Sequence, residues 1–281
     1  GSEMCIRDRP HADSLRRLIE EKSYGHPAAR WIGVPTTAGT GSEVTCWATI
    51  WDPERDAKRS VECRENYAFA ALVDPELAAG MPVTLAVSSA LDAAAHAVES
   101  YWAKGTNAVS RGLALEAIRT IMGHMDGLLA GTMEAHEAMA RGSMLAGLAF
   151  SNTKTTACHS ISYPLTMHCG IPHGAAVSML LGPVFQLNAQ ALARPEPLLD
   201  ALGVSSPEEL AEKVCGILRR SGQPATLKEW GAQREELPRL ARLGMTKGRA
   251  DNNPVPIEPA TILSILEQIY DSSCKLTRKG A

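Results

Sequence analysis

The feature that most constrains the fold is a change in hydrophobic pattern between Gly80 and Thr84. Before it, short apolar runs alternate with turn residues, which predicts strands. After it, apolar residues recur at three- and four-residue spacing, which is typical of amphipathic helices. We therefore expect two units in the 281 residues, a small α/β part over 1–82 and an all-helical domain over 83–281.

The same patterns predict the individual elements. In the first part we expect a helix over about 10–21 and strands over 31–34, 46–52 and about 68–73. In the second part we expect helices over 89–102, 107–125, 133–150, 174–188, 206–222 and 259–270. The segment "SPEELAEKVCGILRRSG" is the clearest of these, because Ser206 can cap the helix, Glu209 completes a capping box and Gly222 ends it.

The composition excludes several classes of function. A net charge of −3 argues against nucleic-acid binding, and no apolar run approaches the roughly 18 residues that a membrane span needs. Seven cysteines, none in a CxxC pair, do not indicate a disulfide framework and favour a cytoplasmic location.

The first residues, "GSEMCIRDRP", do not resemble a native N-terminus. Gly1 and Ser2 look like a cloning scar, and "MCIRDR" resembles a translated sequencing adapter. We therefore expect 1–9 to be non-native.

The segment "SALDAAAHAVESYW" places a carboxylate and an imidazole inside an alanine-rich helix. Asp92 and His96 are four residues apart, so they share a helical face at a distance of roughly 6 Å. Both side chains can then reach one divalent metal ion. Taken alone, the pair favours a structural explanation, in which His96 bonds a nearby acceptor and Asp92 lies near the start of the helix.

A second segment, "KTTACHSISYPLTMHCGIPHGAAVSMLL", adds three histidines, His159, His168 and His173. His173 comes just before an expected helix, where a side chain can project into a cleft. Two of these histidines would join the pair in the first segment to form a site of one carboxylate and three imidazoles. Such donors suit Fe(II), Zn(II) or a similar divalent ion.

A third segment, "PTTAGTGSEVT", is a loop of glycine and threonine. Its glycines allow a ligand to approach the backbone, and its hydroxyl and N–H groups are donors for ribose or phosphate. It matches neither GxGxxG nor a Walker loop. The residues alone leave a plain loop and a ligand cradle equally open.

These three segments, in this order, resemble the motifs of the iron-containing (group III) alcohol dehydrogenase family, "PTTxGTGSE", "DAxxHAxE" and "H…H…PHG". Further similarities are "VDPEL", "LALEAI" and "GRADNNPVPI", so the resemblance covers nearly all of the chain after Ala28. It implies a fold similar to dehydroquinate synthase, with a Rossmann-like N-terminal part followed by a helical metal-binding domain. That is an α/β plus all-α class.

The resemblance also implies the ligands and the reaction. It assigns Asp92, His96, His159 and His173 to the metal, with Fe(2+) expected and Zn(2+) as the alternative. It implies that NAD(P) is contacted by Thr36, Thr37, Gly39, Thr40, Ser42, Thr45, Lys58 and Leu77. For Lys58, a solvated lysine in the charged turn "ERDAKRS" is the alternative. The implied reaction is hydride transfer between NAD(P)H and a small aldehyde, with the metal as a Lewis acid, in a homodimer or larger assembly.

The sequence departs from the family pattern in two places. Where many members carry a proton-relay histidine this chain has Tyr163, and His168 is a second candidate for that role. The chain also lacks the "GGGS" turn and about a hundred residues that precede the threonine loop in the family. We therefore expect a truncated dinucleotide-binding part, a fragment that exposes sheet edge and apolar surface.

One residue points to the substrate. Lys154 stands where many of these dehydrogenases have a neutral residue, and "KTTACHSISYPLT" is most similar to phosphonoacetaldehyde reductases. A phosphonate dianion needs a nearby cation, which a lysine supplies. The alternative for Lys154 is a surface lysine at a helix end. The alternatives for the whole chain are a non-redox lyase like dehydroquinate synthase and an inactive metal-binding fragment.

Overall fold

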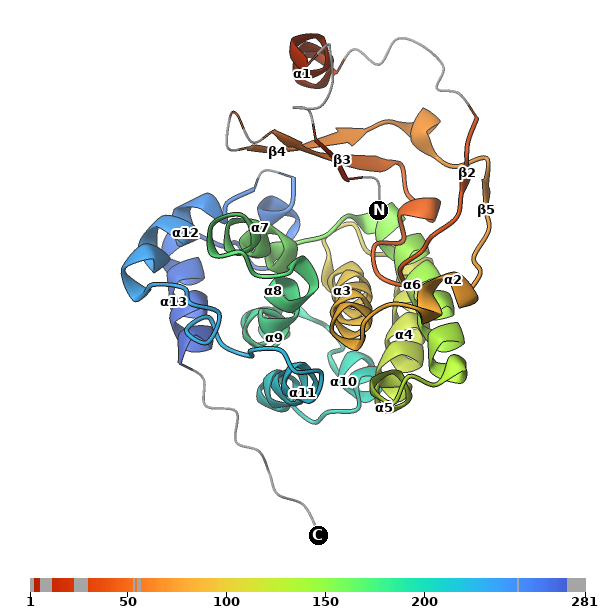
Figure 1. Ribbon diagram of the computed structural model, residues 1–281. Helices are drawn as coiled ribbons and strands as arrows, with labels where there is room; N and C mark the ends of the chain where they lie inside the picture. The colour runs from red at the N-terminus through yellow and green to blue at the C-terminus, as the bar shows by residue number, and fades with distance from the viewer. Residues whose placement is uncertain are drawn as a thin grey trace.

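A body of packed helices makes up most of the protein, and a small strand region lies along one side of it (Figure 1). The computed structural model describes residues 3–5, 12–22, 30–52, 54, 57–246 and 248–271. The expected combination of an α/β part with a helical part is present.

The strands form two small sheets. The first has the order β1-β3-β4 and consists of β1 (Glu3–Cys5), β3 (Trp47–Asp52) and β4 (Ala57–Glu62). In it β3 runs antiparallel to β4, with Trp47 opposite Glu62, and parallel to β1. The second sheet pairs β2 (Ile32–Gly33) with β5 (Ala70–Ala71) in parallel. The helix α1 (Ala12–Glu21) covers the first sheet, where Ile19, Ile50 and Val61 form a small core.

Two expectations for the strand region were wrong. The stretch "ERDAKRS" is not a turn throughout, because its last four residues belong to β4 and pair with β3. The third expected strand is two residues long and exposed, not buried. Phe69 beside it is 67% exposed and Leu72 is 61% exposed, since the β2–β5 pair lies at the rim of the molecule (Figure 1).

The helix α3 (Val83–Trp102) is the centre of the helical body, and every residue from Ala90 to Trp102 is buried. It contacts α4 (Ala108–Gly123), α6 (Met133–Thr153) and α8 (His173–Met179). Five of its central residues are alanines, whose side chains are small, so neighbouring helices can pack close to its backbone on all sides. A helix that is buried all round can hold polar side chains deep inside the protein.

The remaining helices complete the body. They are α2 (Glu76–Ala79), α5 (Met125–Leu129), α7 (Ala157–Cys169), α9 (Leu181–Asn188), α10 (Glu196–Leu202), α11 (Pro207–Arg220), α12 (Leu237–Leu243) and α13 (Pro259–Tyr270). At the start of α11, the Ser206 hydroxyl accepts a hydrogen bond from the Glu209 N–H at 3.2 Å, as the sequence predicts. The expected helix over 174–188 is divided into α8 and α9. Within the described residues, no helix combines the length and the hydropathy needed to cross a bilayer.

Candidate metal centre

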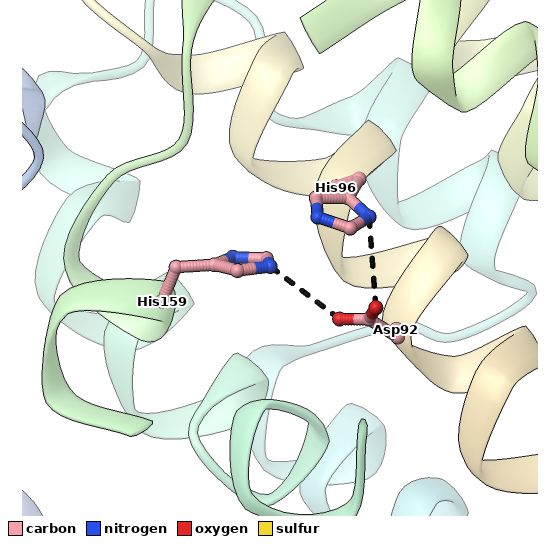
Figure 2. Close-up of side chains that lie close together, drawn as sticks. All are labelled: Asp92, His96 and His159. Atoms are coloured by element: carbon pink, nitrogen blue, oxygen red, sulfur yellow. Dashed lines mark ion pairs between the residues drawn. The ribbon is translucent and has the colours of Figure 1, made fainter. Parts of the chain in front are cut away.

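Three helices bring four predicted ligands to one place. Asp92 and His96 lie one turn apart on α3, His159 lies on α7, and His173 is the first residue of α8. Figure 2 shows the Asp92 carboxylate beside the His96 and His159 rings, with a dashed line to each of them. Asp92, His96 and His159 are 5%, 7% and 2% exposed.

The three imidazoles converge on the Asp92 carboxylate. Its Oδ1 lies 3.4 Å from His159 Nε2 and 3.8 Å from His173 Nε2, while its Oδ2 lies 4.0 Å from His96 Nδ1. The His96 ring is stacked between Phe150, at 4.2 Å, and His159, at 4.4 Å. Phe150 therefore forms an apolar wall that fixes the orientation of His96.

The charges of these groups depend on one another. Burial alone would raise the pKa of Asp92, but the surrounding imidazoles outweigh it and hold that pKa well below its usual range. Burial lowers the pKa of His96 to about 4, against the opposing attraction of Asp92. An ionised carboxylate beside a neutral imidazole is the protonation state in which both groups bind a metal ion.

Unsatisfied polar atoms show that the site fits a divalent ion. Asp92 Oδ1, His96 Nδ1 and His159 Nε2 are buried and make no hydrogen bond to a described residue. Leaving such atoms without a partner is costly in a protein interior. The ligand atoms of these three residues lie within 4.8 Å of one another, and carboxylate oxygen with imidazole nitrogen is a donor set for Fe(II) or Zn(II). The structural explanation of the pair, in which His96 simply bonds an acceptor, leaves these atoms unexplained.

Glu99 is a functional candidate that the sequence analysis did not single out. Its buried carboxylate contacts His159 Nδ1 and accepts hydrogen bonds from the Thr156 hydroxyl and the Cys158 N–H, both at 2.7 Å. Trp102 Nε1 donates in turn to the Thr156 hydroxyl at 2.9 Å. A carboxylate on Nδ1 directs the Nε2 lone pair of a histidine toward a metal, so Glu99 orients His159. The family motif "DAxxHAxE" ends with this glutamate, so the motif could have identified Glu99 as a candidate.

Glycines let the ligand-bearing segments meet. A Cβ atom on Gly174 would lie 1.9 Å from the Ser88 carbonyl oxygen, so only glycine allows the start of α8 to touch α3 beside Asp92. A Cβ atom on Gly39 would lie 3.0 Å from Ser89 of the same helix, a less severe but still tight contact. The Gly39 backbone lies within hydrogen-bonding reach of the His96 ring. The "PHG" and "PTTAGTG" segments are therefore held against the helix that carries two of the four candidate ligands.

A cavity of about 1300 Å³ opens from the four candidate ligands and runs between the β3–β4 sheet and α6, α7 and the threonine loop. Of the residues predicted to contact NAD(P), Thr40, Ser42 and Thr45 line it. Gly39 lies behind this wall against α3. The others are placed elsewhere: Thr36 is exposed, Thr37 lines a second, small cavity and Leu77 is exposed on α2. Lys58 is on β4, but its side chain lies outside the described residues.

The two proton-relay candidates occupy different places. Tyr163 is buried, lines the cavity, and stacks on the His173 ring at 5.7 Å. His168 is in the last turn of α7 and is not among the cavity-lining residues. The structure therefore brings Tyr163, and not His168, to the four candidate ligands.

Lys154 also lines the cavity, at the end of α6. Its side chain is 48% exposed, and its Nζ lies 2.7 Å from Glu62 Oε2 on β4. Its φ of 62° and ψ of 173° fall in a region that residues with a side chain rarely occupy.

Two family models match most of the chain. Residues 7–75 match the model "Iron-containing alcohol dehydrogenase", and residues 86–270 match "Fe-containing alcohol dehydrogenase family, C-terminal". Lactaldehyde reductase of Escherichia coli K12 is 31% identical over 271 residues, which are 93% of this chain and 70% of that protein. Sulfoacetaldehyde reductase of Bilophila wadsworthia is 29% identical over 88% of this chain and 67% of that protein.

Solved structures show the same fold. A 1,3-propanediol oxidoreductase superposes with a TM-score of 0.79 and 30% identity, over 87% of this chain and 67% of that one. Sulfoacetaldehyde reductase from Bifidobacterium kashiwanohense, in complex with NAD+, superposes with a TM-score of 0.81 and 28% identity, over 90% of this chain and 69% of that one. The expected dehydroquinate synthase-like fold is thereby confirmed, and the chain belongs to the iron-containing alcohol dehydrogenase family.

Proposed function

We propose that this protein is a metal- and NAD(P)-dependent aldehyde reductase that converts phosphonoacetaldehyde to 2-hydroxyethylphosphonate. The observation that carries the metal-dependent part is the set of three buried, unbonded donor atoms on Asp92, His96 and His159, which faces a cavity large enough for a cofactor and a small substrate. A non-redox lyase receives no support from the comparisons, whose printed names are those of reductases and dehydrogenases.

In this proposal Asp92, His96, His159 and His173 hold Fe(II) or Zn(II). The metal supplies Lewis-acid polarisation of the substrate carbonyl, and NAD(P)H supplies the hydride. The hydroxyl groups of Thr40, Ser42 and Thr45 offer donors to the cofactor along one wall of the cavity.

The residues of the chain itself must deliver a proton and exclude water. The Tyr163 ring stacks on His173, which places its hydroxyl group near the candidate ligands. We therefore assign this hydroxyl the role of proton donor to the product alcohol. The apolar face of Phe150 covers the His96 ring, which keeps solvent from this candidate ligand.

Lys154 supports the choice of substrate. A side chain in this backbone conformation costs about 1–3 kcal/mol, and such strain is concentrated at functional sites. We propose that the Lys154 ammonium leaves Glu62 to pair with the phosphonate. Two relatives are named for sulfoacetaldehyde, which likewise carries an anionic group beside an aldehyde.

The test is reduction of phosphonoacetaldehyde and of butanal by Fe(II)- or Zn(II)-loaded protein, followed by the absorbance of NADH or NADPH. Lys154→Met should raise KM for phosphonoacetaldehyde about 10-fold or more and leave KM for butanal unchanged. Equal effects on both aldehydes would contradict the pairing. Absence of any metal-dependent reduction would contradict the assignment of the chain as an active enzyme.

We also propose that the protein acts in the cytoplasm as a homodimer or larger assembly, with a division between its two units near residue 82. The exposed apolar side chains of Ile32, Phe69 and Leu72 support association, because burial would remove them from water. The separate family matches over 7–75 and 86–270 support the division. Light scattering of the purified protein measures the assembly directly.

A further inference from the structure

Arg249 is one of four cationic residues that line the cavity, together with Lys22, Arg64 and Lys154. Its guanidinium carbon is 4.9 Å from the centre of the Tyr163 ring, which itself stacks on His173 at 5.7 Å. The Tyr163 ring therefore contacts both the guanidinium and a candidate ligand. The segment "GRADNNPVPI" resembles the family motif, but the resemblance assigns no role to its arginine.

The backbone beneath Arg249 is firmly held. The Asn252 side-chain amide donates to the Thr153 and Thr155 carbonyl oxygens, at 2.8 and 3.0 Å, and so fastens this loop to the segment between α6 and α7. Arg249 Nε donates to the Thr155 hydroxyl at 3.1 Å. A guanidinium anchored through Nε and stacked on an aromatic ring has lost most of its freedom before a ligand arrives, which lowers the entropy cost of binding.

The binding edge of this guanidinium remains available. Among the described residues, no carboxylate forms an ion pair with Arg249, and no hydrogen bond uses its terminal amino groups. Lys154, by contrast, is already paired with Glu62. Two parallel N–H donors match two oxygens of a phosphonate or sulfonate better than one ammonium group does.

We propose that Arg249 is a specificity-determining residue that binds the phosphonate or sulfonate group of a two-carbon aldehyde. The carbonyl group of that aldehyde lies at the candidate metal centre. This inference rests on the proposed function and deepens it, since it assigns the anion-binding role first to Arg249 and second to Lys154. Phosphonate and sulfonate share the required chemistry, and the experiment separates them.

The experiment measures binding and turnover in parallel. Calorimetry on metal-free and on Zn(II)-loaded protein uses 2-hydroxyethylphosphonate, 2-hydroxyethanesulfonate and butanol as probes, and kcat/KM is measured for phosphonoacetaldehyde, sulfoacetaldehyde and butanal. Arg249→Met should weaken binding of the preferred anion about 10- to 100-fold, with the same loss of kcat/KM for its aldehyde and no change for butanal. The anion that wild-type protein binds more tightly identifies the substrate class.

Arg64→Met is the matched control, because Arg64 lines the same cavity from the 3-10 turn η3 (Arg64–Asn66) beside β4. It should leave both anions unaffected. Equal losses in Arg64→Met and Arg249→Met, or a loss for butanal in Arg249→Met, would overturn the inference. If Arg249→Met does not keep the wild-type melting temperature, Arg249→Gln replaces it under the same criteria.

The outcomes also separate this inference from the proposed function. If wild-type protein prefers an anionic aldehyde and only Lys154→Met abolishes the preference, the proposed function stands and the role of Arg249 is refuted. If wild-type protein reduces butanal but shows no preference for either anion, both the anionic substrate and the role of Arg249 are refuted, while the dehydrogenase activity remains.

Discussion

The backbone at Lys154 allows a strain measurement that does not depend on activity. Its φ of 62° and ψ of 173° lie in a region that is essentially confined to glycine. Lys154→Gly should relieve this strain, whereas Lys154→Ala removes the same side-chain contacts and keeps a Cβ atom. The difference between the two variants therefore isolates the backbone from the ion pair with Glu62.

The magnitude follows from opposing effects. Relief of the strain is worth about 1–3 kcal/mol, and glycine costs about 0.5–1 kcal/mol more than alanine because it gains freedom in the unfolded chain. The half-exposed pair with Glu62 contributes roughly 0–1 kcal/mol and is lost in both variants. Lys154→Gly should therefore be more stable than Lys154→Ala by about 1 kcal/mol, within a range of about 0–2.5 kcal/mol, which is the reverse of the usual order.

Urea unfolding of the metal-free protein, followed by circular dichroism, measures this difference. Thermal unfolding gives a second measure, because each kcal/mol of stability corresponds to a shift of about 2–4 °C in Tm for a chain of this size. If Lys154→Gly is no more stable than Lys154→Ala, the backbone at this position is not strained. The structural support for a functional Lys154 would then be lost.

Three further predictions concern the site and its supports. Glu99→Gln should weaken Zn(II) binding about 10- to 100-fold in a chelator competition. Ser100→Ala, which changes a buried side chain one residue further along α3, should not weaken it. Equal losses of Zn(II) affinity in the two variants would mean that Glu99 does not orient His159. Gly174→Ala should destabilise the protein by about 1–3 kcal/mol or more and lower its metal content, measured by urea unfolding and metal analysis, and wild-type values for both would refute the close contact with α3. Burial raises the pKa of Glu43, so ionisation of this side chain lowers the stability of the fold above that pKa and has no effect below the unfolded-state pKa. Glu43→Gln should therefore raise Tm at about pH 8 but not at about pH 4. A gain in Tm that is independent of pH would contradict this.

Sequence patterns predicted the parts of the site that depend on local spacing. Asp92 and His96 share a helical face because of the helical repeat, and the structure places them one turn apart on α3. His173 begins α8 after Pro172, which fits the expectation of a side chain at the start of a helix. Helix α13 has the predicted limits because a proline starts it and its apolar repeat is regular.

Other features depended on contacts between distant segments. The helix α7 was not predicted, because Pro164 and three polar hydroxyl residues interrupt its apolar pattern. The contact between Arg249 and Tyr163 joins residues 86 positions apart, and no local pattern reports such a pair. The division of the threonine loop, with Thr40 at the cavity and Thr36 exposed, is likewise set by packing on α3 and α6.

The close approach of Gly39 to α3 has a thermodynamic consequence. The loop that we assign to the dinucleotide touches Ser89, and its backbone lies beside the ring of His96, so one rigid contact is shared by two binding events. A metal ion bound to His96 should therefore restrict the loop to its binding conformation and raise its affinity for the dinucleotide. Because linkage is reciprocal, a dinucleotide bound to the loop should raise the affinity for the metal ion by the same free energy. Titrations of each ligand in the presence of the other should therefore show cooperativity of equal size in both directions.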